Sequence, residues 1–290
     1  MTRIAKCALP ILLALLGLTG CRTASAVAPE SPYRIVAYVR GKAEIHKIGA
    51  QKLTHINYAF GKVSPEGVIV FDDPDAPAHL AQLQALKAKN PDLKILVSVG
   101  GWGADNFSDA ALTEASRYAF SQSAVELIKR YSLDGIDLDW EYPGQAGPGI
   151  KFRLEDKENF TEMLKSLRQH LDYLAWQRGR WGKDPYLLTI ASAAGRYFEH
   201  TQMDVLHAYL DFINIMTYDM AGAWAPNAGH HAPLYAPRGG DPKISTDSYV
   251  RQHLEAGIPP EKLVVGVPFY ARGFTGAGAE NEGLNQPYET

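Results

Sequence analysis

Between residues 34 and 268, apolar runs of strand length alternate with segments of helical periodicity. Seven runs are predicted as strands, at 34–39, 54–60, 94–99, 136–141, 187–191, 211–217 and 263–268. Helices are predicted at 42–51, 78–89 and 115–131, along an apolar stripe from Phe160 to Leu174, and at 248–256. Mostly continuous apolar strands are typical of a buried parallel sheet. Their regular alternation with helices favours an α/β barrel of the (β/α)8 TIM type over an open sheet.

The run at 136–141 alternates strictly between acidic and apolar residues, which predicts a strand with two different faces. Its acidic face carries Asp137, Asp139 and Glu141. At a rise of about 3.3 Å per residue, neighbours on that face stand roughly 6 to 7 Å apart, so the three carboxylates repel one another. Such an array is tolerated if one member keeps a proton, if it binds a cation, or if it faces water. A calcium loop is excluded because the intervening positions hold large apolar residues instead of ligands and a turn-forming glycine.

Polar and aromatic residues also gather at the ends of the other predicted strands. In a parallel barrel the carboxyl ends of the strands meet at one face, where the chemistry of such folds takes place. The residues expected there are Trp102, Glu141, Tyr218, Asp219, Tyr270 and Arg272.

Composition narrows the classes of partner. The chain has 290 residues, of which 46% are hydrophobic and 21% charged, with a formal net charge of −3. This balance is typical of a globular protein with a large core. The chain has no excess of basic residues, so binding to nucleic acid is not predicted. The pair His230-His231 has no carboxylate or thiol partners at ligand spacing, so neither a metal nor another cofactor is predicted.

The first 28 residues have the pattern of an export signal. Arg3 and Lys6 precede an apolar core at 8–18, and the sequence ending at Cys21 resembles the bacterial lipobox, which predicts a lipid anchor on that cysteine. Ala24-Ser25-Ala26 offers an alternative cleavage site that would release a secreted protein. The only other cysteine is Cys7, so no disulfide is expected in the folded part. The expected organisation is a signal at 1–28 followed by the barrel.

Five stretches resemble the motifs of the family 18 glycoside hydrolases, the chitinases and their relatives. The acidic strand with the aspartate before it matches the family's D-x-x-D-x-D-x-E signature. Three more motifs are Ser98-Val99-Gly100-Gly101-Trp102, Met216-Thr217-Tyr218-Asp219 and Gly266-Val267-Pro268-Phe269-Tyr270-Ala271-Arg272. The fifth stretch comprises Tyr38 and residues 56–60. The resemblance runs from about Arg34 to the last residue. The family's barrel has eight strands, so a barrel cut after its seventh strand is expected. The resemblance implies a catalytic barrel at 29–272 and the start of a further region at 273–290.

The resemblance implies roles for these residues. Glu141 would be the general acid and base, with a pKa that the neighbouring charge of Asp139 raises, and Asp137 would extend the array. In this family the substrate's N-acetyl group replaces a protein nucleophile, and Asp139 and Tyr218 would hold that group. The substrate-binding set is Tyr38, Phe60, Trp102, Met216, Asp219, Trp224, Tyr270 and Arg272. The supporting set is Asp134, Ser98, Gly100 and Gly101. Trp176 and Trp181 are predicted to pack within the protein.

The implied substrate is a β-1,4-linked polymer of N-acetylglucosamine. Two alternatives remain open from the sequence: a non-catalytic protein that binds chitin, and an endo-β-N-acetylglucosaminidase that acts on N-glycans or peptidoglycan. Strand-end motifs report on chemistry at the scissile bond, whereas the choice of polymer depends on loops. The substrate class is therefore better defined than the individual glycan, and the sequence gives no oligomeric state.

Overall fold

A computed structural model describes residues 33–289, and from Arg34 onward they belong to one compact unit. The predicted export signal and the proposed anchor at Cys21 lie outside the described residues. Within 33–289, no helix is long and apolar enough to cross a membrane.

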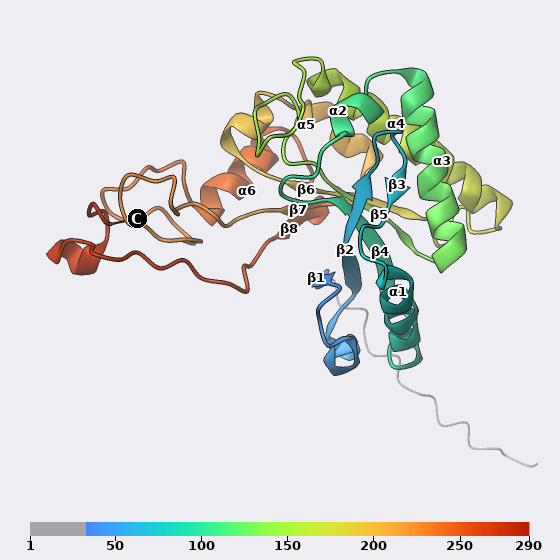
Figure 1. Ribbon diagram of the computed structural model, residues 1–290, viewed down its shortest axis with the longest axis horizontal. Helices are drawn as coiled ribbons and strands as arrows, with labels where there is room; N and C mark the ends of the chain where they lie inside the picture. Colours follow the sequence, from blue (N-terminus) through green and yellow to red (C-terminus); the bar gives the residue numbers. More distant parts are fainter. Residues whose placement is uncertain (1–32, 290) are drawn as a thin grey trace, which may run out of the picture. The chain divides into compact units, whose positions relative to one another are not determined.

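Seven parallel strands in the described part of the chain form an open half-barrel (Figure 1). Their spatial order is β1-β2-β4-β5-β6-β7-β8, so each new strand joins the one before it, while the short β3 pairs antiparallel with β2. The strands are β1 Val36–Arg40, β2 His55–Val63, β3 Ile69–Val70, β4 Lys94–Gly100, β5 Gly135–Asp139, β6 Leu187–Ser192, β7 Phe212–Ile215 and β8 Leu263–Val265. All seven predicted strands of the parallel sheet are confirmed. The predicted strand at 136–141 is β5, which ends at Asp139, so Glu141 lies beyond the strand and not within it.

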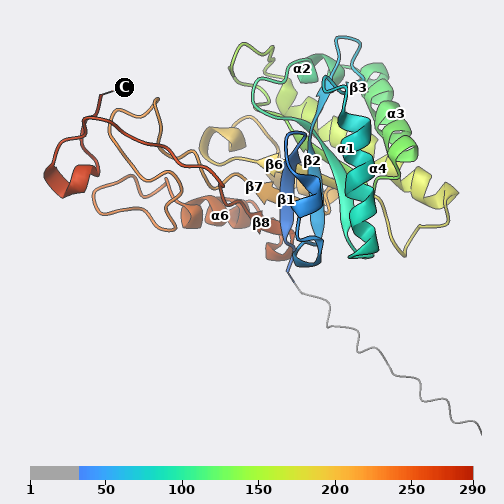
Figure 2. The ribbon, with the colours of Figure 1, turned by 60° about the horizontal axis from the view of Figure 1, so that its bottom comes forward.

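The α-helices follow the predicted alternation. They are α1 Ala76–Ala85, α2 Phe107–Ala110, α3 Glu114–Tyr131, α4 Asp156–Gln177, α5 Met203–Leu206 and α6 Thr246–Glu255. Figures 1 and 2 show α1, α3 and α4 side by side against one face of the sheet. Short 3-10 turns occupy Ile45–Lys47, Ala50–Lys52, Leu86–Ala88, Gly195–Phe198, His207–Tyr209, Pro260–Lys262 and Glu280–Gly283. The single helix predicted at 42–51 was therefore wrong: Ile48 and Gly49 leave the helical conformation and divide it into two turns.

Helix α4 buries the apolar stripe that the sequence predicted. The six members of that stripe are at most 1% exposed: Phe160, Met163, Leu164, Leu167, Leu171 and Leu174. In α3 the buried positions include Phe120, Ala124 and Ile128, whereas Tyr118 is 55% exposed. The helical periodicity of 115–131 predicts a buried Tyr118, and this prediction was wrong because the position lies about 200° around the helix from Phe120.

The apolar face of β5 packs against helices. Trp140, the residue after the strand, is 2% exposed, and its ring stacks on Phe107 at 5.3 Å and meets Phe160 edge-on at 5.4 Å. Trp176 and Trp181 are 65% and 59% exposed, so the prediction that they pack in the interior was wrong. Leu174 in the same turn of α4 is buried, so Trp176 lies on the opposite, solvent-facing side of the helix, and Trp181 lies beyond the end of the helix. Alternation along β5 thus separates an apolar outer face from an acidic inner one.

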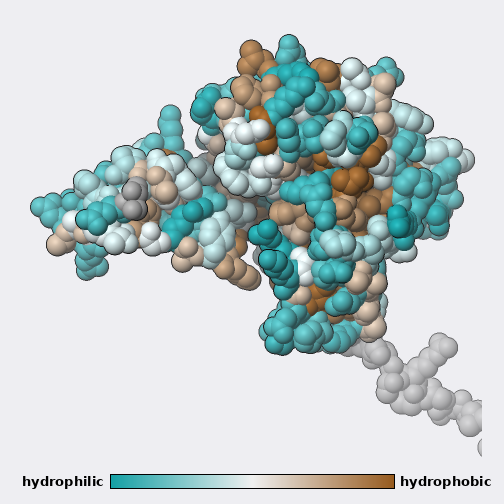
Figure 3. Space-filling model, viewed as in Figure 1, coloured by the Kyte–Doolittle hydropathy of each residue, from teal (hydrophilic) through white to brown (hydrophobic). Residues whose placement is uncertain are grey.

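Strands β1 and β8 are the two ends of the sheet, and within residues 33–289 each pairs on one side only. The buried apolar core runs from Val39 to Ile258 and takes no residue from the segment after β8. That segment lies beside the loop after β7, joined to it by backbone hydrogen bonds between Ala228 and both Asn285 and Gln286. Figure 3 shows mainly hydrophilic and intermediate residues on this part.

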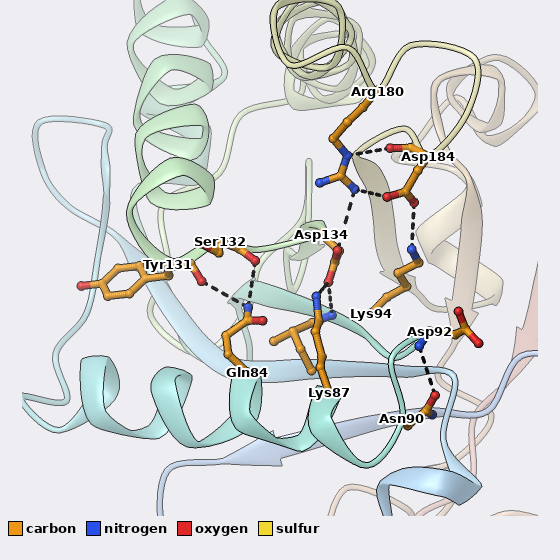
Figure 4. Close-up of polar contacts among 11 residues, drawn as sticks. Gln84, Lys87, Asn90, Asp92, Lys94, Tyr131, Ser132, Asp134, Arg180 and Asp184 are labelled. Carbon is orange, nitrogen blue, oxygen red and sulfur yellow. Dashed lines mark hydrogen bonds and ion pairs between the residues drawn. The ribbon is translucent and has the colours of Figure 1, made fainter.

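Asp134 ties the amino-terminal ends of three strands together (Figure 4). Its Oδ2 accepts hydrogen bonds from the backbone N–H of Ile95 at 2.8 Å and from Lys87 Nζ at 2.6 Å. Its Oδ1 lies 3.8 Å from the Arg180 guanidinium, and its backbone carbonyl accepts from Leu187 N. Asp134 is 6% exposed and lies at the end of β5 opposite to Glu141, so it supports the sheet without facing the acidic cluster.

We expect Asp134→Ala to lower the free energy of unfolding by about 3 kcal/mol, because the Ile95 N–H and two cations would lose a buried acceptor. Chemical denaturation of the variant beside the wild type measures this loss. Asp92→Ala is the matched control, since this nearby aspartate is exposed and its carboxylate forms no hydrogen bond within residues 33–289. Equal stability of the two variants would contradict the assigned role.

Candidate active site

Asp137 lies inside the half-barrel and accepts hydrogen bonds from four other strands. The donors are Tyr38 Oη of β1 at 2.9 Å, Ser98 Oγ of β4 at 2.7 Å, Thr189 Oγ1 of β6 at 2.5 Å and Asn214 Nδ2 of β7 at 3.3 Å. Its side chain is fully buried, which raises its pKa, while these hydrogen bonds stabilise the carboxylate and oppose that rise. Asp137 therefore connects the centre of the sheet to the acidic residues above it.

Asp139 is the last residue of β5 and is 6% exposed. Burial holds its pKa well above the ordinary value, and the charges of Glu141 and Asp137 raise it further. Its Oδ1 is buried and has no hydrogen-bond partner within residues 33–289. A buried carboxyl oxygen without a partner is costly in the protein alone, and a donor from a bound molecule would satisfy it.

Glu141 stands two residues beyond the strand, at the carboxyl end of the sheet. Burial raises its pKa to about 7, the charge of Asp219 adds to that rise, and a hydrogen bond with Tyr142 and the charge of Lys62 oppose it. The sequence predicted a raised pKa and attributed it to Asp139, whereas burial is its largest cause here. At neutral pH a carboxyl group with this pKa is present in both its protonated and its ionised form.

Two glycines allow β4 to approach the end of β5. Gly100 and Gly101 have φ angles of +126° and +83°, and the Gly101 N–H donates to the backbone carbonyl of Asp139 at 2.8 Å. A Cβ at Gly100 would collide with that same carbonyl, and one at Gly101 would press into the ring of Phe60. Both positions therefore require glycine, and they set the backbone of Asp139.

The loop after β7 and the segment after β8 meet at Asp219. Its carboxylate accepts from Tyr270 Oη at 2.7 Å and from Arg272 Nε at 2.9 Å, and the Arg272 guanidinium lies 4.6 Å from the centre of the Trp224 ring. Tyr218, beside Asp219, is partly buried, which raises the pKa of its hydroxyl, so the group remains a hydrogen-bond donor. The residues predicted at the end of β7, Tyr218 and Asp219, thus lie beside those predicted after β8, Tyr270 and Arg272.

A cavity of about 220 Å³ opens beside Glu141. It is lined by Glu141, Tyr142, Gln145, Ala193, Ala194, Arg196, Tyr197, Met216, Tyr218, Asp219 and Tyr249. Four predicted site residues are in this lining: Glu141, Met216, Tyr218 and Asp219. Trp102 and Trp224 lie outside it and are 65% and 60% exposed. Phe60 packs on Gly101 and Tyr38 on Asp137, so these two flank the acidic cluster.

Several residues of the site were not predicted. Thr189 and Asn214 are polar positions within apolar strands, and that break in the pattern is a signal that could have identified them as inward-facing. Tyr142 directly follows the acidic signature, and its ring lies 6.1 Å from those of both Trp102 and Tyr197. Tyr197 reaches the cavity from the loop after β6 and carries no sequence signal. Its buried hydroxyl has no partner in the described part of the chain.

The histidine pair was predicted not to hold a metal. His231 lies beside the site, with its Nδ1 3.5 Å from Asp219 Oδ1. Among residues 33–289, no three His, Cys, Asp or Glu side chains are placed to hold a metal ion.

Comparison with known proteins gives one family. The model of glycosyl hydrolases family 18 matches residues 34–290. Chitinase A1 of Niallia circulans is 38% identical over 91% of this chain and 46% of its own length. An N-acetylglucosaminidase of that family from Paenibacillus barengoltzii superposes with a TM-score of 0.80 at 42% identity, covering 88% of this chain and 74% of that one. Chitinase ChiW from Paenibacillus sp. str. FPU-7, a multi-modular cell-surface enzyme, superposes with a TM-score of 0.81 at 39% identity. The match covers 89% of this chain and 32% of that one. The chain spans about half the length of the curated relatives it matches.

Proposed function

This chain belongs to the family 18 glycosyl hydrolases, and from its site we propose that it hydrolyses β-1,4-linked polymers of N-acetylglucosamine. The observation that carries the proposal is Glu141, whose pKa burial raises to about 7 at the mouth of a cavity and beside two further acids. A carboxylic acid must keep its proton near neutral pH to deliver it to a leaving sugar oxygen.

In the first step Glu141 protonates the glycosidic oxygen as the bond to the anomeric carbon breaks. The carbonyl oxygen of the substrate's own N-acetyl group attacks that carbon and gives a cyclic oxazolinium ion. The buried, unpartnered Oδ1 of Asp139 supports a role in accepting the acetamido N–H, which would satisfy it. The Tyr218 hydroxyl lines the same cavity and would donate to the acetamido oxygen, aligning it for attack.

In the second step the ionised Glu141 removes a proton from water, which attacks the anomeric carbon and opens the oxazolinium ring. The proton returns to Glu141, the acetamido group is regenerated, and the anomeric configuration is retained. The ion carries a positive charge that Asp139 and Asp137 would stabilise from below. Exposed Trp102 and Trp224 offer apolar faces for neighbouring sugar rings.

The alternative of a protein that only binds sugar lacks a specific supporting observation. A site that only binds sugar does not need a buried acid with a raised pKa. Such a group destabilises the folded protein, and this loss is expected where catalysis requires the acid. The likeness to an N-acetylglucosaminidase favours instead a second candidate function, the release of single N-acetylglucosamine units.

We expect the chain to release the fluorophore from a fluorogenic N,N′-diacetylchitobioside, with kcat/KM falling above about pH 7. The sign follows from Glu141: its pKa is about 7, the acid must be protonated, and the protonated fraction declines as pH rises. The measurement is a pH profile between 4 and 9, beside the matching fluorogenic monosaccharide. Preferential cleavage of the monosaccharide would favour the second candidate. No cleavage of either sugar by a chain that melts cooperatively would contradict the proposed hydrolysis.

A further inference from the structure

Lys62 brings a cation to the edge of the acidic cluster from strand β2. Its Nζ donates a hydrogen bond to the backbone carbonyl of Gly100 at 2.7 Å and lies 5.4 Å from the centre of the Phe60 ring. The side chain is partly buried, and burial lowers its pKa. An ammonium group in this position costs solvation, so its neighbours must favour it.

The hydrogen bond of Lys62 acts on the backbone that positions Asp139. Gly100 ends β4 and pairs in register with Asp139, and the next residue, Gly101, donates to the carbonyl of Asp139. Gly100 has no room for a side chain against that carbonyl. Lys62 therefore holds the end of β4 in place, and this end of β4 positions the backbone of Asp139.

The charge of Lys62 acts on both acids of the site, whereas the Arg272 guanidinium is paired with Asp219. The titratable groups that face Asp139 and Glu141 are Tyr38 of β1, Lys62 of β2, Asp137 of β5, Tyr142 after β5, Tyr197 after β6, and Tyr218 with Asp219 after β7. All except Lys62 are carboxyl groups or phenols, so among the described residues it is the one cation in this set. The other charges that face Lys62 are Arg40 and Asp72, and both are exposed, where solvent screens them.

We propose that Lys62 is a positioning residue for the hydrolysis proposed above: it fixes the Gly100 carbonyl beside Asp139 and supplies the positive charge that favours ionisation of the Asp139 and Glu141 pair. Burial and mutual repulsion keep protons on these two acids. The cation limits that effect, so the pair can lose one proton near neutral pH and hold the other. The inference rests on the proposed function only for its kinetic consequence.

Three substitutions test the charge of Lys62 with and without a hydrogen-bond donor. Lys62→Met removes both the charge and the donor, Lys62→Gln keeps a donor without charge, and Lys62→Arg keeps both. We expect both limbs of the kcat/KM profile to move to higher pH in the Met and Gln variants, with kcat/KM about two- to fivefold lower on the acid side. The Arg variant restores the wild-type profile. Lys129→Met is the control, because this lysine pairs with Glu126 on the surface of α3, in the last turn before the amino-terminal end of β5, and Glu141 lies beyond the other end of that strand.

A second readout does not depend on activity. Carboxyl carbons of 13C-labelled aspartate and glutamate are titrated by NMR in the full chain, with Asp139→Asn and Glu141→Gln providing the assignments. We expect both carboxyls to titrate at higher pH in Lys62→Met than in the wild type, even if the wild type hydrolyses none of the sugars offered. Superimposable titration curves, or kinetic profiles that keep their pH limits in Lys62→Met, would overturn the inference. A wild type without hydrolysis but with shifted titrations would refute the proposed function and leave this inference standing.

Discussion

Glu141→Gln is expected to lower turnover of a fluorogenic chitobioside by about a thousandfold, within the range by which a positioned general acid accelerates such steps. Glutamine has nearly the same shape as glutamic acid but cannot deliver a proton to the leaving oxygen or accept one from water. Glu141 serves in both steps of the proposed reaction, and Asp219, the other carboxyl group lining the cavity, is engaged by Tyr270 and Arg272. The loss should appear in kcat, because the proton transfer belongs to the chemical steps and not to sugar binding.

Binding should survive in the same variant. Isothermal titration with a chitooligosaccharide is expected to give the Glu141→Gln protein an affinity within a few fold of the wild type, since the lining of the cavity keeps its shape. Glu158→Gln is the control, an exposed glutamate on the first turn of α4 whose loss should leave both quantities unchanged. If Glu141→Gln kept more than a tenth of the wild-type turnover, Glu141 would not be the acid.

The sequence predicted those parts of the molecule in which a periodic pattern reports directly on burial. Strict alternation from Ile136 to Trp140 places Trp140 against the helices and Asp137 and Asp139 inside, as the structure has them. The stripe from Phe160 to Leu174 predicted the buried face of α4 for the same reason. Both patterns extend over several residues and are fixed by the geometry of strand and helix, so they survive without knowledge of the partners.

Predictions failed where a residue's surroundings come from distant parts of the chain. Trp176 is an apolar residue within a helical segment, but it lies on the side of α4 opposite to the buried Leu174, and its ring remains exposed. The cause of the raised pKa of Glu141 was assigned to its neighbour in sequence, although burial by the surrounding loops dominates. Tyr197 and Lys62 reach the acids from other strands and loops, and no local pattern indicates that they do.

Asp139→Asn is expected to have opposite effects on activity and stability. The variant should lose turnover by about a hundredfold, since a neutral amide stabilises the oxazolinium charge less well and presents an N–H or a carbonyl where a carboxylate is needed. The same change removes an ionisable group from a site that penalises its charged form. The stability consequence follows from the direction of its pKa shift.

Burial, Glu141 and Asp137 raise the pKa of Asp139 in the folded protein above its value in the unfolded chain. The folded state therefore binds this proton more tightly, so its contribution to stability is complete below the unfolded pKa and is lost as pH rises through the folded one. At pH 8 the wild type bears the cost of ionised acids in a buried cluster, and Asp139→Asn should melt about 2 to 4 °C higher, the effect of roughly 1 kcal/mol in a chain of this size. At pH 4 the advantage should vanish, because the wild-type carboxyl is then protonated. Melting curves at both pH values, with Asp92→Asn as an exposed control, measure the difference. A variant that is less stable than the wild type at pH 8 would show that Asp139 holds the fold together and is not strained for catalysis.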